Sequence, residues 1–203
     1  MQFSTWFKFK VLSLNSEAFK RAADELAQLA RGFEPNVIIG IRTGGYELAA
    51  LVKTSLPVAE LLPVTCRRPG TEGKNKFSIV KAMLCILPHF ITDRLRIAEH
   101  IMLTQLRTVE TIMPSLDTQE LAAIERCLAK YGASAKVLII DDAVDRGATL
   151  KAVRNTINSI ANPAAVIKMA AITVTTAAPL IEPDFSLYRY VLCRFPWSLD
   201  AKN

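Results

Sequence analysis

Val137-Leu-Ile-Ile-Asp-Asp-Ala-Val-Asp-Arg-Gly-Ala-Thr-Leu150 is the stretch around which the rest of the chain is organised. Its four aliphatic residues predict a short strand buried on both faces, and Asp141 and Asp142 follow where that strand should leave the core. Gly147 permits a tight turn, and Thr149 is a candidate N-cap for the amphipathic run 150–160. The order predicts a strand, an anion-binding turn and a helix N-terminus, preceded by two carboxylates.

A second segment has the same order of strand, turn and helix. Apolar side chains at helical spacing predict a helix over Asn15 to Arg31, and Asn36 to Ile41 reads as a buried strand. Arg42-Thr-Gly-Gly-Tyr46 follows, and a helical run extends through Val52. Glycines let backbone amides approach phosphate oxygens, although a Gly-Gly turn taken alone is more often structural.

Size and composition narrow the classes of protein. The chain has 203 residues, of which 51% are hydrophobic, enough for one core and at most one extra lobe. Its formal charge of +6 suits a phosphorylated ligand but also nucleic acid or an acidic membrane surface. Four scattered cysteines lack the spacing of a zinc site or a disulfide framework, and no apolar run reaches the roughly 18 residues of a membrane span. We expect a cytoplasmic protein with no membrane partner.

The block Ile139 to Thr149 resembles the phosphoribosyl-pyrophosphate (PRPP) binding motif of the type I phosphoribosyltransferases. That motif has several aliphatic residues, two acids, two apolar residues, Asp, Thr or Ser, Gly, any residue, and Thr or Ser. Arg146 stands where the family usually has a small hydroxyl residue. Ile39 to Tyr46 is similar to the family's pyrophosphate loop, often a basic residue before Gly-Gly, with Thr43 at the usual basic position.

The resemblance implies a fold and an activity. The fold would be α/β, a Rossmann-like central parallel sheet flanked by helices, in a single domain 1–203 with a helical insertion at 84–135. The activity would be Mg²⁺-dependent transfer of the phosphoribosyl group of PRPP to a nitrogenous acceptor, a nucleobase among the candidates, with release of pyrophosphate. The alternative is a non-catalytic regulator of the same fold that senses PRPP or nucleotides, and nucleic acid stays open as its partner.

The resemblance also implies roles for individual residues. Asp141 and Asp142 are the candidate ligands of Mg²⁺ and of the ribose hydroxyls, and Asp145 is the candidate general base. Arg146 either contacts phosphate or pairs with Asp145 and weakens it as a base. The expected 5′-phosphate site comprises Asp145, Arg146, Gly147, Ala148 and Thr149, and the expected pyrophosphate site comprises Arg42, Thr43, Gly44, Gly45, Arg67 and Arg68.

The basic segment 67–76 and the two helices of the insertion each have more than one interpretation. Leu61 to Cys66 and Phe77 to Ala82 predict strands around the basic segment 67–76, which is either a loop that closes over PRPP or a solvated hairpin tip. The insertion predicts one helix over about 87–113, broken near Pro88, and a second from Asp117 to Tyr131 with Glu120 completing a capping box. These helices are a lid over the acceptor pocket, an oligomer interface or core packing, and we expect a homodimer.

The C-terminal segment from Tyr188 to Ser198 predicts a final edge strand that ends in aromatic residues. Phe195 and Trp197 either stack near the acceptor or cap the core. The acceptor itself is the least defined partner in the sequence.

Overall fold

Five parallel strands form the central sheet of the computed structural model, which describes residues 10–57, 60–67, 88–106 and 115–198. The strand order is β3-β2-β6-β7-β8. The strands are β2 (Val37–Ile41), β3 (Glu60–Val64), β6 (Lys136–Val144), β7 (Val166–Val174) and β8 (Phe185–Arg189). The expected parallel α/β architecture is confirmed.

Strand β6 lies between β2 and β7 and is longer than its aliphatic run. It pairs with β2 from Val37↔Val137 to Gly40↔Ile140, and with β7 as far as Val144↔Val174. The expectation that the strand ends before the two acids was wrong, because pairing with β7 continues through them. Asp141 and Asp142 therefore lie within the strand, where backbone pairing holds their positions.

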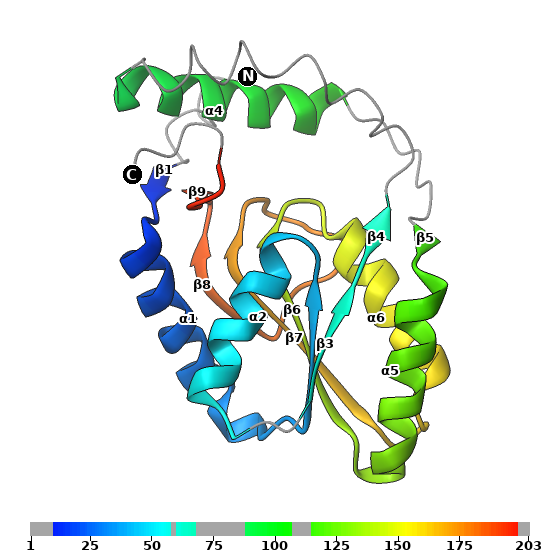
Figure 1. Ribbon diagram of the computed structural model, residues 1–203. Coiled ribbons are helices and arrows are strands. Elements are labelled where there is room, and N and C mark those ends of the chain that lie inside the picture. The colour runs from blue at the N-terminus through cyan, green and yellow to red at the C-terminus, as the bar shows by residue number, and fades with distance from the viewer. Residues whose placement is uncertain (1–9, 58–59, 68–87, 107–114, 199–203) are drawn as a thin grey trace.

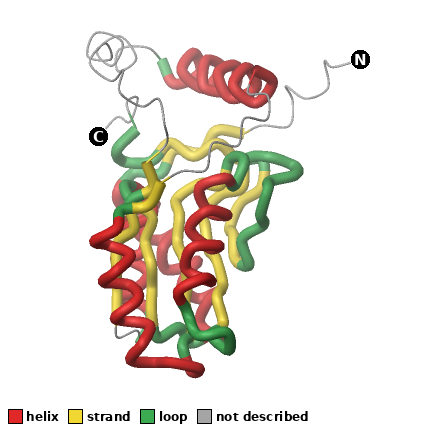
Figure 2. Tube along the Cα trace, turned by 90° about the vertical axis from the view of Figure 1, so that its right-hand side faces the viewer, coloured by secondary structure: helices red, strands yellow, loops and turns green. Residues whose placement is uncertain are grey.

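Helices cover both faces of the sheet (Figures 1 and 2). On one face α1 (Ser16–Ala30) and α2 (Gly44–Ser55) pack against Ile38, Leu138 and Ile140. On the other face α5 (Thr118–Tyr131) and α6 (Ala148–Ile160) pack against alternate residues of the same strands, among them Val37, Ile39 and Val137. This alternation follows from the two-residue period of a strand, so the fully buried strands are apolar on both sides.

The helix ends confirm some of the expected caps and correct others. Asn15, one of the two candidates with Ser16, caps α1, and Asp117 caps α5 where the sequence predicts that helix to begin. Thr149 is not the N-cap of α6, because Gly147 adopts a left-handed conformation (φ 76°) and the helix begins at Ala148. The reciprocal half of the capping box is also wrong, since the side chain of Glu120 accepts hydrogen bonds from Thr65 instead.

Two short sheets extend the fold at its edges. Strand β1 (Lys10–Ser13) pairs in parallel with β9 (Val191–Arg194), and β4 (Cys66–Arg67) pairs antiparallel with β5 (Ser115–Leu116). The C-terminal segment is therefore not one strand from Tyr188. It divides at Tyr190, which has a positive φ of 59°, so that β8 stays in the central sheet while β9 pairs with β1.

Helix α4 (His89–Leu106) lies above the end of the sheet at which the parallel strands finish (Figure 1). It begins directly after Pro88, in agreement with the expected break there. The expected strand 77–82 and the rest of the first insertion helix lie outside the described residues. Two short 3₁₀ helices, Arg31–Phe33 and Gly132–Ser134, follow α1 and α5. None of the helices described is long and apolar enough to cross a membrane.

The close packing of β2 on α2 predicts the effect of a small substitution. A Cβ atom at Gly40 would lie 2.7 Å from the Tyr46 Cα and 2.9 Å from the Ala49 Cβ. Gly40→Ala should therefore destabilise the protein by about 1–3 kcal/mol through overpacking, as measured by urea denaturation. Gly32→Ala is the matched control, since a Cβ at Gly32 meets nothing within 4 Å. Equal stability of the two variants would contradict the packing described.

Candidate functional site

Two adjacent carboxylates lie in the last part of β6 with their side chains half-buried. The Asp142 amide donates to the Asp141 Oδ1 at 3.0 Å, and the Ala143 amide donates to the Asp142 Oδ1 at 3.0 Å. Burial raises the pKa of Asp142 above its ordinary value, and the nearby Asp145 raises it further, although hydrogen bonds from Asp141 and Ala143 oppose the shift. The site thus holds a carboxylate that a cation would stabilise.

The loop between β2 and α2 packs directly on these carboxylates. A Cβ atom at Gly44 would collide with the Asp142 Oδ2 and lie 2.6 Å from the Trp197 Cζ2. A Cβ at Gly45 would lie 2.7 Å from the Ile140 carbonyl oxygen. Both positions therefore require glycine. The two motifs of the sequence meet here because β2 and β6 are parallel neighbours whose carboxyl ends share one edge of the sheet.

The turn from β6 into α6 has the geometry of an anion site. Gly147 places the first helical residue at Ala148, and the first amides of a helix have no partners within the helix itself. A neighbouring loop supports the turn, since the Leu180 amide donates to the Arg146 carbonyl at 2.8 Å. The Asp145 Oδ1 accepts a hydrogen bond from the Thr175 hydroxyl at 2.7 Å. Thr175, the residue that follows β7, thereby orients the side chain of Asp145.

Arg42 stands at the entrance of the glycine loop. Its side chain is 51% exposed, and its Nε lies 3.2 Å from the Glu120 Oε1. The guanidinium carbon lies 5.4 Å from the centroid of the Tyr46 ring. Thr43, the next residue, precedes α2 without capping it by its side chain. The backbone of Arg67 lies in β4, whereas Arg68 is outside the described residues.

The aromatic residues at the C-terminal end form a stack against α1. The rings of Phe195 and Trp197 are nearly parallel with centroids 5.2 Å apart, and Phe19 meets Trp197 edge-on at 5.0 Å. Phe195 belongs to the buried core, whereas Trp197 is 43% exposed and lies against Gly44. The structure thus brings Trp197 to the carboxylates and places Phe195 behind it.

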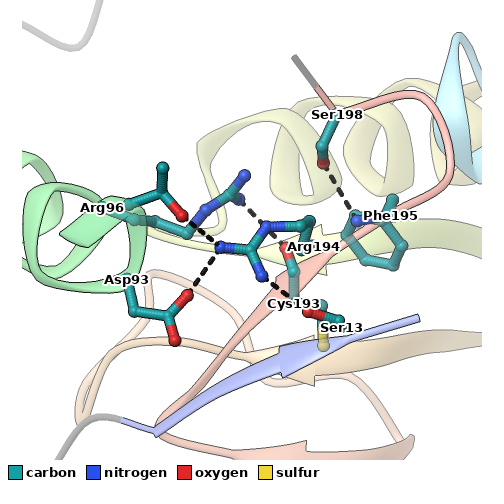
Figure 3. Close-up of polar contacts among 8 residues, drawn as sticks. Ser13, Asp93, Arg96, Cys193, Arg194, Phe195 and Ser198 are labelled. Atoms are coloured by element: carbon teal, nitrogen blue, oxygen red, sulfur yellow. Dashed lines mark hydrogen bonds and ion pairs between the residues drawn. The ribbon is translucent and has the colours of Figure 1, made fainter. Parts of the chain in front are cut away.

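Arg194, next to this stack, fastens α4 to β9 (Figure 3). Its side chain is only 2% exposed, and its Nη2 lies 2.6 Å from the Asp93 Oδ1 and 3.0 Å from the Thr92 hydroxyl. Its Nη1 donates to the Ser13 hydroxyl at 2.6 Å, so β1 joins the same cluster. In addition, Arg96 donates to the Cys193 carbonyl at 3.1 Å. The buried cation therefore connects the insertion to the aromatic end of the chain.

Three of these residues have roles that sequence reasoning missed. Thr175 follows the end of β7, so its meeting with Asp145 could have been predicted from two parallel neighbours that end together. Glu120 has a clear sequence signal, but the signal favoured a helix cap. Arg194 is the one charged residue of an otherwise apolar strand, and the sequence does not indicate that its partners lie on α4.

A divalent metal would have few protein ligands at this site. Within the described part of the chain no group of three or more His, Cys, Asp or Glu residues is placed to hold one. Asp141 and Asp142 offer hard carboxylate oxygens, and Mg²⁺ typically takes one or two carboxylates and completes its shell with water and phosphate oxygens. The donor set fits Mg²⁺ bound together with a phosphorylated ligand.

Comparison with known proteins identifies the fold. No family model and no curated protein matches the sequence. The purine phosphoribosyltransferase of Pyrococcus horikoshii Ot3 superposes with a TM-score of 0.57 at 18% identity, covering 92% of this chain and 93% of the other. The Helicobacter pylori xanthine-guanine-hypoxanthine phosphoribosyltransferase gives 0.57 at 14% identity, covering 94% and 95%. A Neisseria gonorrhoeae hypothetical protein with bound ppGpp also gives 0.57 at 14% identity, covering 93% and 90%.

These structures share their architecture with the present chain over nearly its whole length. The chain therefore has the type I phosphoribosyltransferase fold, as the resemblance of its Asp-Asp block implied. The identities are too low to carry an activity from one protein to the other, so the function is argued from the site.

The buried carboxyl of Asp142 predicts a pH-dependent effect on stability. Because the folded-state pKa lies above the ordinary value of 3.8, the group favours folding at low pH and costs stability as pH rises through its folded-state pKa. Asp142→Asn should stabilise the ligand-free protein at pH 8 by on the order of 1 kcal/mol, and the gain should shrink toward pH 4.5. Thermal unfolding across this range measures it.

Glu125→Gln is the control for the loss of one negative charge, because Glu125 is exposed on α5. Its effect on the unfolding temperature should stay small at every pH. A destabilised Asp142→Asn variant at pH 8 would contradict the raised pKa.

Proposed function

We propose that this protein transfers the phosphoribosyl group of PRPP to a nitrogenous acceptor and releases pyrophosphate, with Mg²⁺ as cofactor. One observation carries the proposal. Gly44 and Gly45 lie directly against Asp142 and Asp141, beside the turn at the head of α6. A glycine loop, two carboxylates and a helix N-terminus thus meet at one edge of the sheet, where open α/β sheets bind their ligands.

Each part of PRPP has a matching surface in this arrangement. The 5′-phosphate would bind the turn from Asp145 to Thr149, whose helix amides and dipole favour an anion. The ribose hydroxyls would donate to Asp141 and Asp142. Pyrophosphate would lie on the backbone of the glycine loop, within reach of Arg42 at its entrance.

The protein's part in the reaction is mainly electrostatic. Departure of pyrophosphate leaves positive charge on C1′ of the ribose, which carboxylates and an oriented acceptor can stabilise. Asp141 and Asp142 would hold Mg²⁺ directly or through water, and bound Mg²⁺ would offset the charge of the pyrophosphate. No covalent intermediate with the protein is required.

Asp145 is the proposed general base for the acceptor nitrogen. Thr175 donates to its Oδ1 at 2.7 Å, and its other oxygen accepts no hydrogen bond from the described residues. The carboxylate is exposed, so that second oxygen can accept a proton from a bound acceptor. Such a base typically contributes about 10²–10⁴-fold to the rate.

The acceptor would bind beside Trp197. This ring is 43% exposed, lies against Gly44, which also packs on the carboxylate of Asp142, and stacks on Phe195. A supported aromatic face suits a planar heterocycle such as a nucleobase. The purine substrates in the names of two proteins of this fold support the same class of acceptor. A homodimer remains a prediction.

Removal of the two carboxylates tests the enzyme directly. The Asp141→Asn/Asp142→Asn double variant should lose pyrophosphate release from isotope-labelled PRPP and Mg²⁺ across a panel of nucleobases. Asp145→Asn should keep PRPP binding and lower kcat by about 10²–10⁴-fold. Glu125→Gln, remote on α5, serves as the control with unchanged turnover. Wild-type protein that turns over no acceptor in the panel would refute the transferase.

A second candidate is a non-catalytic sensor of PRPP or nucleotides, with nucleic acid as a partner that the charge of +6 leaves open. The ppGpp bound to the Neisseria gonorrhoeae protein supports it, since that ligand also presents pyrophosphate groups on a ribose. The two functions differ in one measurement. A sensor binds PRPP or ppGpp in calorimetry without turnover, whereas the transferase releases pyrophosphate.

A further inference from the structure

Glu120 joins three segments at the entrance of the glycine loop. Its Oε2 accepts from the Thr65 amide at 2.5 Å, and its Oε1 accepts from the Thr65 hydroxyl at 3.1 Å. The same Oε1 lies 3.2 Å from the Arg42 Nε. The Asp117 amide, at the cap of α5, donates to the Thr65 carbonyl at 3.3 Å. The side chain of Glu120 is 19% exposed, so these contacts hold it in place.

Arg42 is held in place at the Nε side of its guanidinium and at its backbone amide. Its amide donates to the Val64 carbonyl at 2.9 Å, and its guanidinium lies over the Tyr46 ring. Glu120 engages Nε, whereas the terminal nitrogens donate no hydrogen bond to the residues that the structure describes. A guanidinium is a planar fork whose terminal nitrogens bind phosphate oxygens in pairs. Half of the Arg42 side chain is exposed, which leaves that edge accessible.

We propose that Glu120 is a positioning residue that holds Arg42 by Nε and thereby presents its terminal nitrogens to the pyrophosphate of PRPP. The inference rests on the proposed function, because it assigns pyrophosphate to the glycine loop that Arg42 begins. Arg42 then supplies the positive charge that Thr43, at the position where this loop usually has a basic residue, cannot supply. Glu120 itself touches no substrate.

A contribution to folding stability does not explain the ion pair between Arg42 and Glu120. An ion pair with one half-exposed partner contributes little to folding, because solvent screens it. An arginine that is not held in place, in contrast, loses much side-chain freedom when it binds a ligand. Holding the guanidinium in advance removes part of that cost. A carboxylate beside a polyanion site is otherwise unfavourable, since like charges repel.

For Glu120→Gln, positioning and charge therefore predict opposite changes in the affinity for pyrophosphate. Glu120→Gln removes a negative charge near the pyrophosphate site, so electrostatics alone predicts tighter binding of pyrophosphate. Positioning predicts binding about tenfold weaker, because the amide cannot hold the guanidinium as an ion pair. Isothermal titration of the full chain with pyrophosphate and Mg²⁺ measures the difference.

Two internal controls separate positioning from damage to the fold. Glu47→Gln removes a negative charge from the exposed first turn of α2, near the same loop, and should leave pyrophosphate binding equal or tighter. Ribose 5-phosphate lacks pyrophosphate and should bind Glu120→Gln as it binds wild type. A variant that loses both ligands equally has a structural defect, which would overturn the assignment.

A double-mutant cycle tests whether Glu120 acts through Arg42. Arg42→Lys keeps the charge but removes Nε, so Glu120→Gln should have little further effect in that background. If the two single variants lose pyrophosphate affinity additively, or if Glu120→Gln binds pyrophosphate more tightly, the positioning role of Glu120 is overturned and the proposed function is not affected. Wild-type protein that binds neither pyrophosphate nor PRPP would overturn the proposed function as well.

Discussion

The parallel pairing of β2 with β6 is the constraint on which the rest of the site depends. In register from Val37↔Val137 to Gly40↔Ile140, β2 ends beside the last part of β6, and both following turns enter helices at the same edge. Contact between those turns then requires that Gly44 and Gly45 have no side chains, because Asp142 and the β6 backbone fill the space. A shift of register by one residue would separate the loop from the carboxylates and would exchange the side chains that face the two helical layers.

The same pairing explains why this edge is electrostatically unusual. The central strands are buried on both sides, so an acid within β6 loses hydration, and burial raises the pKa of Asp142. Helices α2 and α6 begin at this edge and direct their positive dipole ends toward it. Two helix N-termini that flank a carboxylate pair suit the ligand proposed above, which carries phosphate at both ends.

Sequence predicted the parts of this structure that depend on local pattern. Aliphatic runs predicted β2 and β6, and the predicted starts of two helices at Asn15 and Asp117 match α1 and α5. What failed was set by partners far along the chain. Pairing with β7 carries β6 past its aliphatic run, and Thr65 draws Glu120 away from its own helix. Gly147 could have been identified as the cap only by its positive φ, which a residue sequence does not specify.

The buried guanidinium of Arg194 bears on how such a chain can evolve. Its counter-ion, Asp93, lies on α4, so the insertion supplies the charge with which this side chain of β9 pairs. A neutral residue at position 93 would leave the guanidinium buried but without that ion pair, at a typical cost of about 3–5 kcal/mol, comparable to much of a domain's stability. The sequence of the insertion is therefore tied to the sequence near the other end of the chain. A chain that lost Asp93 would have to replace Arg194 as well.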